Sequence, residues 1–229
     1  MNLLAIDTAT EACSAAILLG DRLFERYEHA PREHNRLILP MIEGLLEESG
    51  LDAGDLDAVA FGCGPGSFTG VRIAAGVTQG IALGLDLPVV PVSTLAALSL
   101  DAMDSGRVDL AYACIDARMN EVYWGVYVRD PECGVRLMGE EIVKSASDVQ
   151  GLLGGLGVGT GSGWTTYRDV LIERVGEGLI NILPDRFPRA GAIAQLAAPV
   201  FERRGGLSVE QALPVYLRDN VARKPGGCP

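Results

Sequence analysis

One pattern occurs twice along the chain, and it constrains the fold more than any other feature. Residues 5–18 read AIDTATEACSAAIL, and residues 113–128 read ACIDARMNEVYWGVYV. In both stretches an apolar strand ends in Ile-Asp, a short turn with a glutamate follows, and a second strand begins. Because a repeated unit of this kind indicates duplication, the sequence predicts two copies of one α/β architecture, each with a mixed sheet flanked by helices.

The elements of the first copy follow from its apolar patterns. Strands are predicted at residues 2–7, 12–19, 23–29, 57–63 and 87–92. Helical periodicity predicts a helix over 33–49 that Gly50 ends, and a second that begins at about Gly70. Ser93 is a candidate N-cap for a third helix, which extends through Met103.

The second copy is expected to continue with a further strand, a helix at 146–153, another strand and a helix at 189–203. The polar turn Asp104-Ser105-Gly106 predicts the boundary between subdomains 1–104 and 105–229. The C-terminal segment can pack back on the N-terminal half, and its last residues, 224–229, have the composition of a disordered end.

The two subdomains are expected to face each other across a cleft. Asp7 and Asp116 end the first strand of each copy, and ligands of α/β proteins favour such strand ends. Asp116-Ala117-Arg118 could supply a functional acid and cation, or it could be a surface turn with an Arg118–Glu121 ion pair. The glycines at 157, 159, 161 and 163 could admit a nucleotide or form a flexible turn.

The loop Gly64–Gly70, GPGSFTG, joins a strand to a helix, as phosphate-binding loops do. A Walker loop needs a lysine to neutralise phosphate charge, and Val71-Arg72 follows this loop instead. Ser67 or Thr69 can cap the helix, and backbone N–H groups at its start could bind an anion. The loop is therefore either an anion site or a device for close packing.

Small residues line one face of the helix after this loop. Gly76, Gly80 and Gly84 recur every four residues, and Ala75 and Ala82 are expected to extend the small surface. Each interior glycine costs about 1 kcal/mol relative to alanine, so the stripe calls for a compensating contact. The neighbour that approaches this face can belong to the same chain or to a partner.

The helix at 33–49 also has more apolar positions than one narrow face requires. Leu37, Met41 and Leu45 form one stripe, beside a second apolar row, so part can be core and part a partner surface. Pro40 is expected to bend this helix because it lacks the N–H for one hydrogen bond.

The composition limits the classes of function. The net charge is −11 and no basic run occurs, so the chain is not expected to grip nucleic acid by itself. It begins without a signal-peptide pattern, and Asp86, Pro88 and Pro91 interrupt its most apolar stretch, so a cytoplasmic protein outside the membrane is expected. The five cysteines include no CxxC pair, which favours reduced, mostly buried thiols.

The sequence lacks the motifs of a catalytic or metal site. His29 and His34 lack metal-ligand spacing, and no HExxH or GxSxG motif occurs. No catalytic residue and no metal ligand is therefore predicted.

Four motifs, read in order, resemble the bacterial TsaB family, also called YeaZ. They are IDTATEACSAAIL, GCGPGSFTGVRIAAGVTQGIA, IDARMNEVYWGVY and PVYLRDNVA, and the resemblance covers nearly the whole chain, most weakly between about 131 and 188. It implies an actin/sugar-kinase/Hsp70-like fold of two duplicated subdomains. It also implies a non-catalytic role in making N6-threonylcarbamoyladenosine (t6A) at position 37 of tRNAs that read ANN codons.

The resemblance further implies partners. These are the catalytic paralogue TsaD, the ATPase TsaE and a second copy of the chain; tRNA is reached through the complex, after the synthase TsaC has made threonylcarbamoyl-adenylate. No cofactor of its own is implied, although ATP or ADP could bind at the partner interface or on TsaE. The expected partner surface comprises Leu37, Met41, Leu45, Arg72, Gly76, Gly80 and Gly84.

Two departures from the related catalytic sequences bear on function. Thr94 and Leu98 stand where TsaD is expected to carry its HxxxH metal motif, and neither offers a nitrogen ligand. The superfamily's Asp-x-Gly phosphate loops are replaced by loops with Ala9 and Arg118 at the third position. The sequence thus predicts a degenerate nucleotide cleft of Asp7, Thr8, Gly64, Ser67, Asp116 and Arg118. The alternatives are a stand-alone ATPase or kinase of the same fold, and a glycoprotease-like peptidase that uses Ser67.

Overall fold

The computed structural model describes residues 1–152 and 155–218. Its first sheet has the order β3-β2-β1-β4-β5, in which β1, β2 and β3 are antiparallel and β1, β4 and β5 are parallel. The bounds are β1 (Asn2–Asp7), β2 (Ala12–Leu19), β3 (Arg22–His29), β4 (Ala58–Gly64) and β5 (Val89–Ser93).

The second sheet repeats this arrangement. Its order is β8-β7-β6-β10-β11, again with three antiparallel strands followed by parallel ones, and β9 also pairs with β7. The bounds are β6 (Leu110–Arg118), β7 (Glu121–Asp130), β8 (Gly134–Leu137), β9 (Ile142–Ser145), β10 (Gly157–Thr160) and β11 (Leu179–Leu183). The shared strand order confirms the predicted mixed α/β class with two similar sheets.

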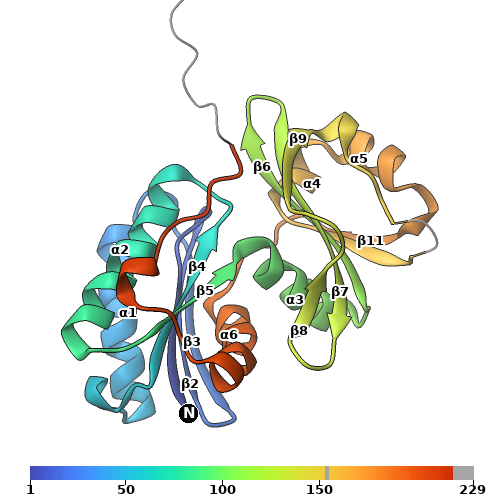
Figure 1. Cartoon of the computed structure of the whole chain (residues 1–229). Helices are drawn as coiled ribbons and strands as arrows, with labels where there is room; N and C mark the ends of the chain where they lie inside the picture. Colours follow the sequence, from blue (N-terminus) through green and yellow to red (C-terminus); the bar gives the residue numbers. More distant parts are fainter. Residues whose placement is uncertain (153–154, 219–229) are drawn as a thin grey trace, which may run out of the picture.

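The helices cover both faces of each sheet (Figure 1). Their bounds are α1 (His34–Ser49), α2 (Phe68–Leu85), α3 (Thr94–Gly106), α4 (Ser162–Thr166), α5 (Arg168–Val175) and α6 (Ala190–Arg204). Alternate residues of β1 explain the layers: Leu4 and Ile6 face the core beneath α1 and α2, whereas Leu3 and Ala5 face α6.

The two halves of the chain exchange helices. α3 follows the first sheet in sequence but packs on β6, β7, β8 and β10, while α6 follows the second sheet and packs on β1, β2, β4 and β5. α3 and α6 also contact each other, so the central core lies between the two sheets. The sequence boundary expected at residue 104 is therefore not a boundary in the packing.

Local signals account for several helix ends. The Ser93 side chain accepts hydrogen bonds from the N–H groups of Leu95 and Ala96, at 3.1 and 3.2 Å, and thereby begins α3. Gly50 ends α1 in the left-handed conformation with φ 68°. The turn predicted at Asp104–Gly106 was wrong, because these residues form the last turn of α3 and Arg107, with φ 52°, ends it.

The helix predicted over 146–153 was also wrong. Only Ala146–Asp148 forms a single 3-10 turn, residues 149–152 are not helical, and residue 153 lies outside the described part. Gly151 weakens helix formation, and a Cβ there would lie 3.0 Å from the Val175 Cα. The described residues of the second subdomain therefore contain no counterpart of α1.

The C-terminal segment, residues 205–218, returns along the first subdomain to the junction with the second (Figure 1). Leu207 bridges to Val89, the Ala212 carbonyl accepts a hydrogen bond from Gln79, and the Val215 N–H donates to the Cys63 carbonyl at 2.7 Å. The end predicted to be disordered, 224–229, lies outside the described residues.

α2 is long and apolar enough to cross a membrane by length and composition alone, which is weak evidence, because core helices of soluble proteins meet the same criterion. It packs on β4 and β1 of the first sheet.

Candidate functional site

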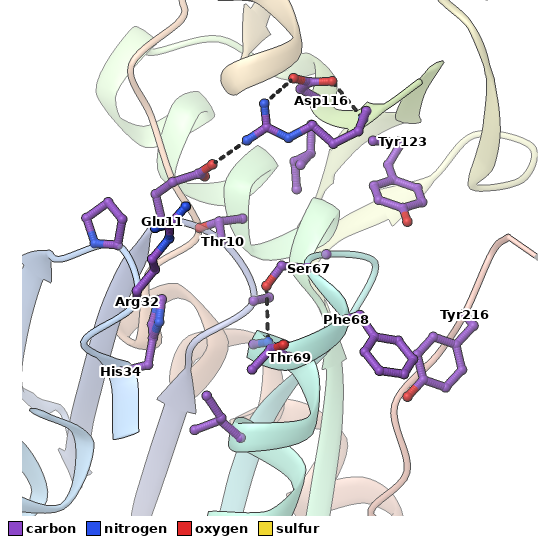
Figure 2. A pocket seen from close by; sticks show the side chains of 18 of the residues that line it. Thr10, Glu11, Arg32, His34, Ser67, Phe68, Thr69, Asp116, Tyr123 and Tyr216 are labelled. Atoms are coloured by element: carbon purple, nitrogen blue, oxygen red, sulfur yellow. Dashed lines mark hydrogen bonds and ion pairs between the residues drawn. The ribbon is translucent and has the colours of Figure 1, made fainter. Parts of the chain in front are cut away.

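A cleft of about 950 Å³ opens between the two subdomains (Figure 2). It is lined by the turn after β1, the starts of α1 and α2, the end of β6, and the C-terminal segment. Of the residues predicted for a degenerate nucleotide cleft, Ser67, Asp116 and Arg118 line it. Asp7, Thr8 and Gly64 are buried and are not among its lining residues.

Asp7 is completely buried at the end of β1. Its Oδ1 accepts a hydrogen bond from the Ala9 N–H at 3.2 Å, while its Oδ2 has no hydrogen-bond partner among the described residues. Burial disfavours the charged carboxylate and raises the pKa of Asp7 to about 7. A Cβ at Gly62 would lie 2.0 Å from Oδ2, so the glycine is needed to accommodate this side chain.

The glycine loop packs against the chain's own backbone. The Ser67 N–H donates to the Ala9 carbonyl, and the Thr8 hydroxyl donates to the Gly70 carbonyl, each at 2.7 Å. A Cβ at Gly66 or Gly70 would lie 2.4 or 2.0 Å from a backbone oxygen of this turn. The turn after β1 thus occupies the space over the loop, and Ser67 caps α2 by accepting from the Gly70 N–H at 3.1 Å.

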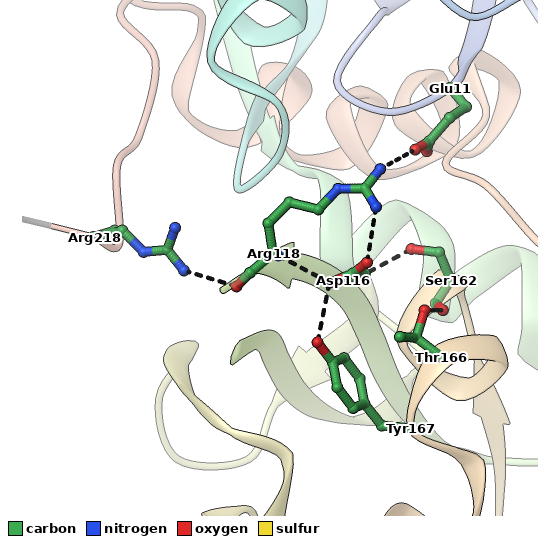
Figure 3. A network of polar contacts seen from close by, with 7 residues as sticks. All are labelled: Glu11, Asp116, Arg118, Ser162, Thr166, Tyr167 and Arg218. Atoms are coloured by element: carbon green, nitrogen blue, oxygen red, sulfur yellow. Dashed lines mark hydrogen bonds and ion pairs between the residues drawn. The ribbon is translucent and has the colours of Figure 1, made fainter. Parts of the chain in front are cut away.

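Asp116 and Arg118 form an ion-pair network across the cleft (Figure 3). Arg118 Nη1 lies 3.1 Å from Asp116 Oδ2, and its Nη2 lies 3.3 Å from Oε1 of Glu11, which comes from the opposite subdomain. The Asp116 carboxylate also accepts from the Arg118 N–H at 2.8 Å and from the Tyr167 hydroxyl at 3.5 Å. A side chain therefore stands where a glycine would leave room for phosphate.

The Arg118–Glu121 ion pair, one of the two alternatives for this turn, is not present among the described residues. Glu121 instead pairs with Arg218 from the C-terminal segment. The reason is the turn between β6 and β7, in which Arg118, Met119 and Asn120 all adopt left-handed conformations with φ between 58 and 64°. The Arg118 side chain extends from this turn toward Glu11 in the other subdomain.

The outer face of α2 carries the three predicted glycines. Gly76, Gly80 and Gly84 are exposed, and no heavy atom lies within 4 Å of a Cβ built at any of them. No described part of the chain fills the space over these three glycines. Leu83 is 73% exposed and Phe68 55% exposed beside the glycines, and neither residue belongs to the predicted partner surface.

Part of the predicted partner surface is core instead. Met41 and Leu45 are buried, and Leu37 is partly buried, because this side of α1 faces β2 and β3. Ala75 and Ala82 do not extend the glycine face, since both are buried on the opposite side of α2. Among these apolar and small residues, the surface that remains belongs to α2.

Arg72 lies at the cleft end of this face. Its guanidinium carbon is 3.5 Å from the Phe68 ring centroid, and its Nε donates to the Tyr216 hydroxyl at 2.8 Å. These contacts fix Arg72 between α2 and the C-terminal segment. A hollow of about 470 Å³ begins here and extends along α2 to Gly76 and Val77.

The second glycine-rich stretch also accommodates the chain's own atoms. A Cβ at Gly159 would lie 2.5 Å from the Trp164 ring, and one at Gly161 would lie 2.4 Å from the Cys114 carbonyl. Within the described residues, no group of three His, Cys, Asp or Glu side chains could hold a metal. Of the four cysteines there, three are buried and Cys133 is half-buried, all as free thiols, whereas Cys228 lies outside this part.

Two polar clusters between the subdomains gave no signal in the sequence, because their members are distant along the chain. Arg189, just before α6, pairs with Glu25 of β3 and lies over the Tyr27 ring. Ser93 and Tyr127 both hydrogen-bond Glu141, whose pKa burial raises. These contacts join β3 to α6, and β5 to the second sheet.

Comparison with known proteins agrees with this architecture. A family model described as "TsaD: tRNA N6-adenosine threonylcarbamoyltransferase" matches residues 27–225. The two similar sheets and this match place the chain in the actin/sugar-kinase/Hsp70-like fold class.

Relatives that match over nearly their full length carry a more specific description than this family model. The chain is 42% identical to "tRNA threonylcarbamoyladenosine biosynthesis protein TsaB" of Escherichia coli K12, over 98% of this chain and 97% of that one. It is 37% identical to the protein of the same description in Haemophilus influenzae, over 98% and 96%. A solved structure, "YeaZ from Pseudomonas aeruginosa", is 43% identical with a TM-score of 0.88, over 94% of this chain and 99% of that one. The chain belongs to the TsaB family.

Proposed function

We propose that this protein is a required, non-catalytic subunit in the biosynthesis of t6A in tRNA. In this proposal it binds the transferase TsaD through the outer face of α2 and activates it together with TsaE. The names of its relatives, biosynthesis proteins for threonylcarbamoyladenosine, support the pathway. The tRNA is held mainly by other subunits, since a chain of net charge −11 repels a phosphate backbone.

The observation that carries the proposal is the outer face of α2. Together the three glycines cost the helix about 2 kcal/mol relative to alanine, yet nothing in the described chain uses the space they leave. Exposed Leu83 and Phe68 flank them, so a helix of a partner could approach closely and bury apolar surface. The same face can join two copies of this chain when TsaD is absent.

The buried neighbourhood of Thr94 and Leu98 supports a non-catalytic role. Both side chains are fully buried, and the Thr94 hydroxyl donates to the Pro65 carbonyl. At these positions the side chains pack in the core, and the Thr94 hydroxyl is engaged in a backbone hydrogen bond. Neither side chain is of a kind that could replace the histidines of a metal site. Ser67, the nucleophile that a peptidase would need, is used as the N-cap of α2. ATP or ADP, where required, would bind at the interface with the partner or on TsaE.

The test is the mass of the complex with TsaD, measured by light scattering after size-exclusion chromatography. Gly80→Trp is expected to abolish the complex, because the indole fills the space that the partner helix needs. Gly54→Trp is a matched control: its Cβ also faces open space, but it lies in the 3-10 turn before β4. A Gly80→Trp complex of unchanged mass would refute the proposed interface.

A further inference from the structure

The cleft between the subdomains and the hollow along α2 are adjacent. The cleft and the hollow along α2 share four lining residues: Asn35, Phe68, Thr69 and Ile73. The α2 groove, as we call the two together, runs from the outer face of α2 to the space between the subdomains. The cleft alone, at about 950 Å³, already matches the upper end of small-molecule sites. A ligand that fills both hollows must extend from the space between the subdomains to Gly76 of α2.

The α2 groove carries positive charge on an acidic protein. Among the described residues, four arginines line it, namely Arg32, Arg72, Arg118 and Arg218, against two carboxylates, and Arg218 is already paired with Glu121. Both carboxylates, Glu11 and Asp116, already pair with Arg118. Arg32 and Arg72 form no ion pair within the described residues. These two arginines give the groove local positive charge on a chain whose net charge is −11, so by local charge complementarity the groove is the part of this surface that favours an acidic ligand.

The walls of the groove combine fixed apolar surface with unused polar groups. Phe68, Tyr123 and Tyr216 contribute aromatic rings, and the contacts of Arg72 with Phe68 and Tyr216 hold that end of the groove in place. Thr10 Oγ1 and His34 Nε2 are buried without a hydrogen-bond partner in the described part of the chain, and both residues line the cleft.

We propose that the α2 groove binds an extended acidic segment of the partner protein, with a carboxylate of that segment paired to Arg32. The inference rests on the proposed function, because the groove begins at the face of α2 where the partner would dock. Docking then reaches beyond the helix face, and the partner's own chain occupies the cleft that other members of this fold class use for nucleotides.

The test is the affinity of the full-length chain for TsaD, measured by calorimetry at two salt concentrations. Arg32→Glu is expected to weaken binding at least tenfold at low salt and to reduce the salt dependence, because it puts a like charge against the acidic segment. Arg168→Glu is the matched control: it makes the same charge change at the exposed start of α5, outside the groove, and should stay within twofold of wild type.

A photo-crosslinking residue at position 123, in the cleft wall, identifies the occupant. An adduct with an acidic stretch of TsaD is expected in the complex. An adduct with a stretch that lacks acidic residues, or unchanged affinity of Arg32→Glu, would overturn the inference and leave the α2 docking face intact. Loss of ADP binding in Arg32→Glu, with TsaD binding unchanged, would assign the groove to a small anion and overturn it too. Failure of the wild-type chain to bind TsaD at all would refute both proposals.

Discussion

From the outer face of α2 we predict a set of substitutions that stabilises the isolated chain, whereas most substitutions destabilise a protein. Replacing Gly76, Gly80 and Gly84 together by alanine should stabilise the monomer. None of the three has a heavy atom within 4 Å of the added Cβ, and none has the positive φ that would strain an alanine. The substitution therefore costs nothing in the fold and reduces the entropy of the unfolded chain.

The magnitude follows from helix propensity. Alanine is favoured over glycine by about 0.8–1.0 kcal/mol in a helix interior. Gly84 lies one residue before the end of α2 and contributes less, so the three changes together should add about 2 kcal/mol. For a chain of this size, each kcal/mol raises Tm by about 2–4 °C, which gives an increase of about 4–8 °C.

The assay is thermal unfolding at a concentration where light scattering shows monomer. This condition matters because a wild-type dimer that uses the glycine face would itself raise Tm. The same triple variant should bind TsaD more weakly than wild type, because three methyl groups hold the partner helix away. A lower Tm in the monomer would refute the reasoning, since the glycines would then serve the chain's own fold.

Three further predictions follow from the first subdomain and the cleft. Gly70→Ala should lower the free energy of unfolding by about 2–3 kcal/mol in chemical denaturation, because its Cβ would lie 2.0 Å from the Thr8 carbonyl oxygen; a neutral effect would contradict the close packing. Burial raises the pKa of Asp7 to about 7 from 3.8, so its favourable contribution is complete below pH 3.8 and is lost as the pH rises to about 7. The free energy of unfolding of Asp7→Asn, relative to wild type, should therefore increase between pH 4 and 7 by at most about 1.4 kcal/mol per pH unit and then level off. A difference that does not depend on pH would mean that Asp7 does not titrate in this range. Arg118→Gln should cost less than about 1 kcal/mol in the same denaturation assay, because Arg118 is 74% exposed and its ion pairs are screened by water; a larger loss would show that the cross-cleft contact holds the subdomains together.

The repeat made the architecture predictable from the sequence. Two Ile-Asp strand ends, each followed by a second strand, are enough to predict duplicated sheets, and the strand orders agree. Local chemistry was equally readable: Ser93 caps α3 and Gly50 ends α1, because these signals act within a few residues.

Long-range packing was not predictable in the same way. The apolar stripe of α1 fits both core and interface, and only the position of the first sheet decides that Met41 and Leu45 are buried. The partner of Arg118 depends on three consecutive left-handed residues and on Glu11, over a hundred residues away in sequence. The exchange of α3 and α6 likewise leaves no periodic signal, because each helix is apolar whichever sheet it covers.

The most direct test of the central claim is t6A formation in a reconstituted reaction. It contains tRNA, ATP, threonine, bicarbonate, TsaC, TsaD and TsaE, with the wild-type chain, the Gly80→Trp variant, the Gly54→Trp control or no addition. A role as a required, non-catalytic subunit predicts product with wild type and the control, and none with Gly80→Trp, without this chain, or without TsaD. Product in the absence of TsaD, or full product with Gly80→Trp, would contradict it.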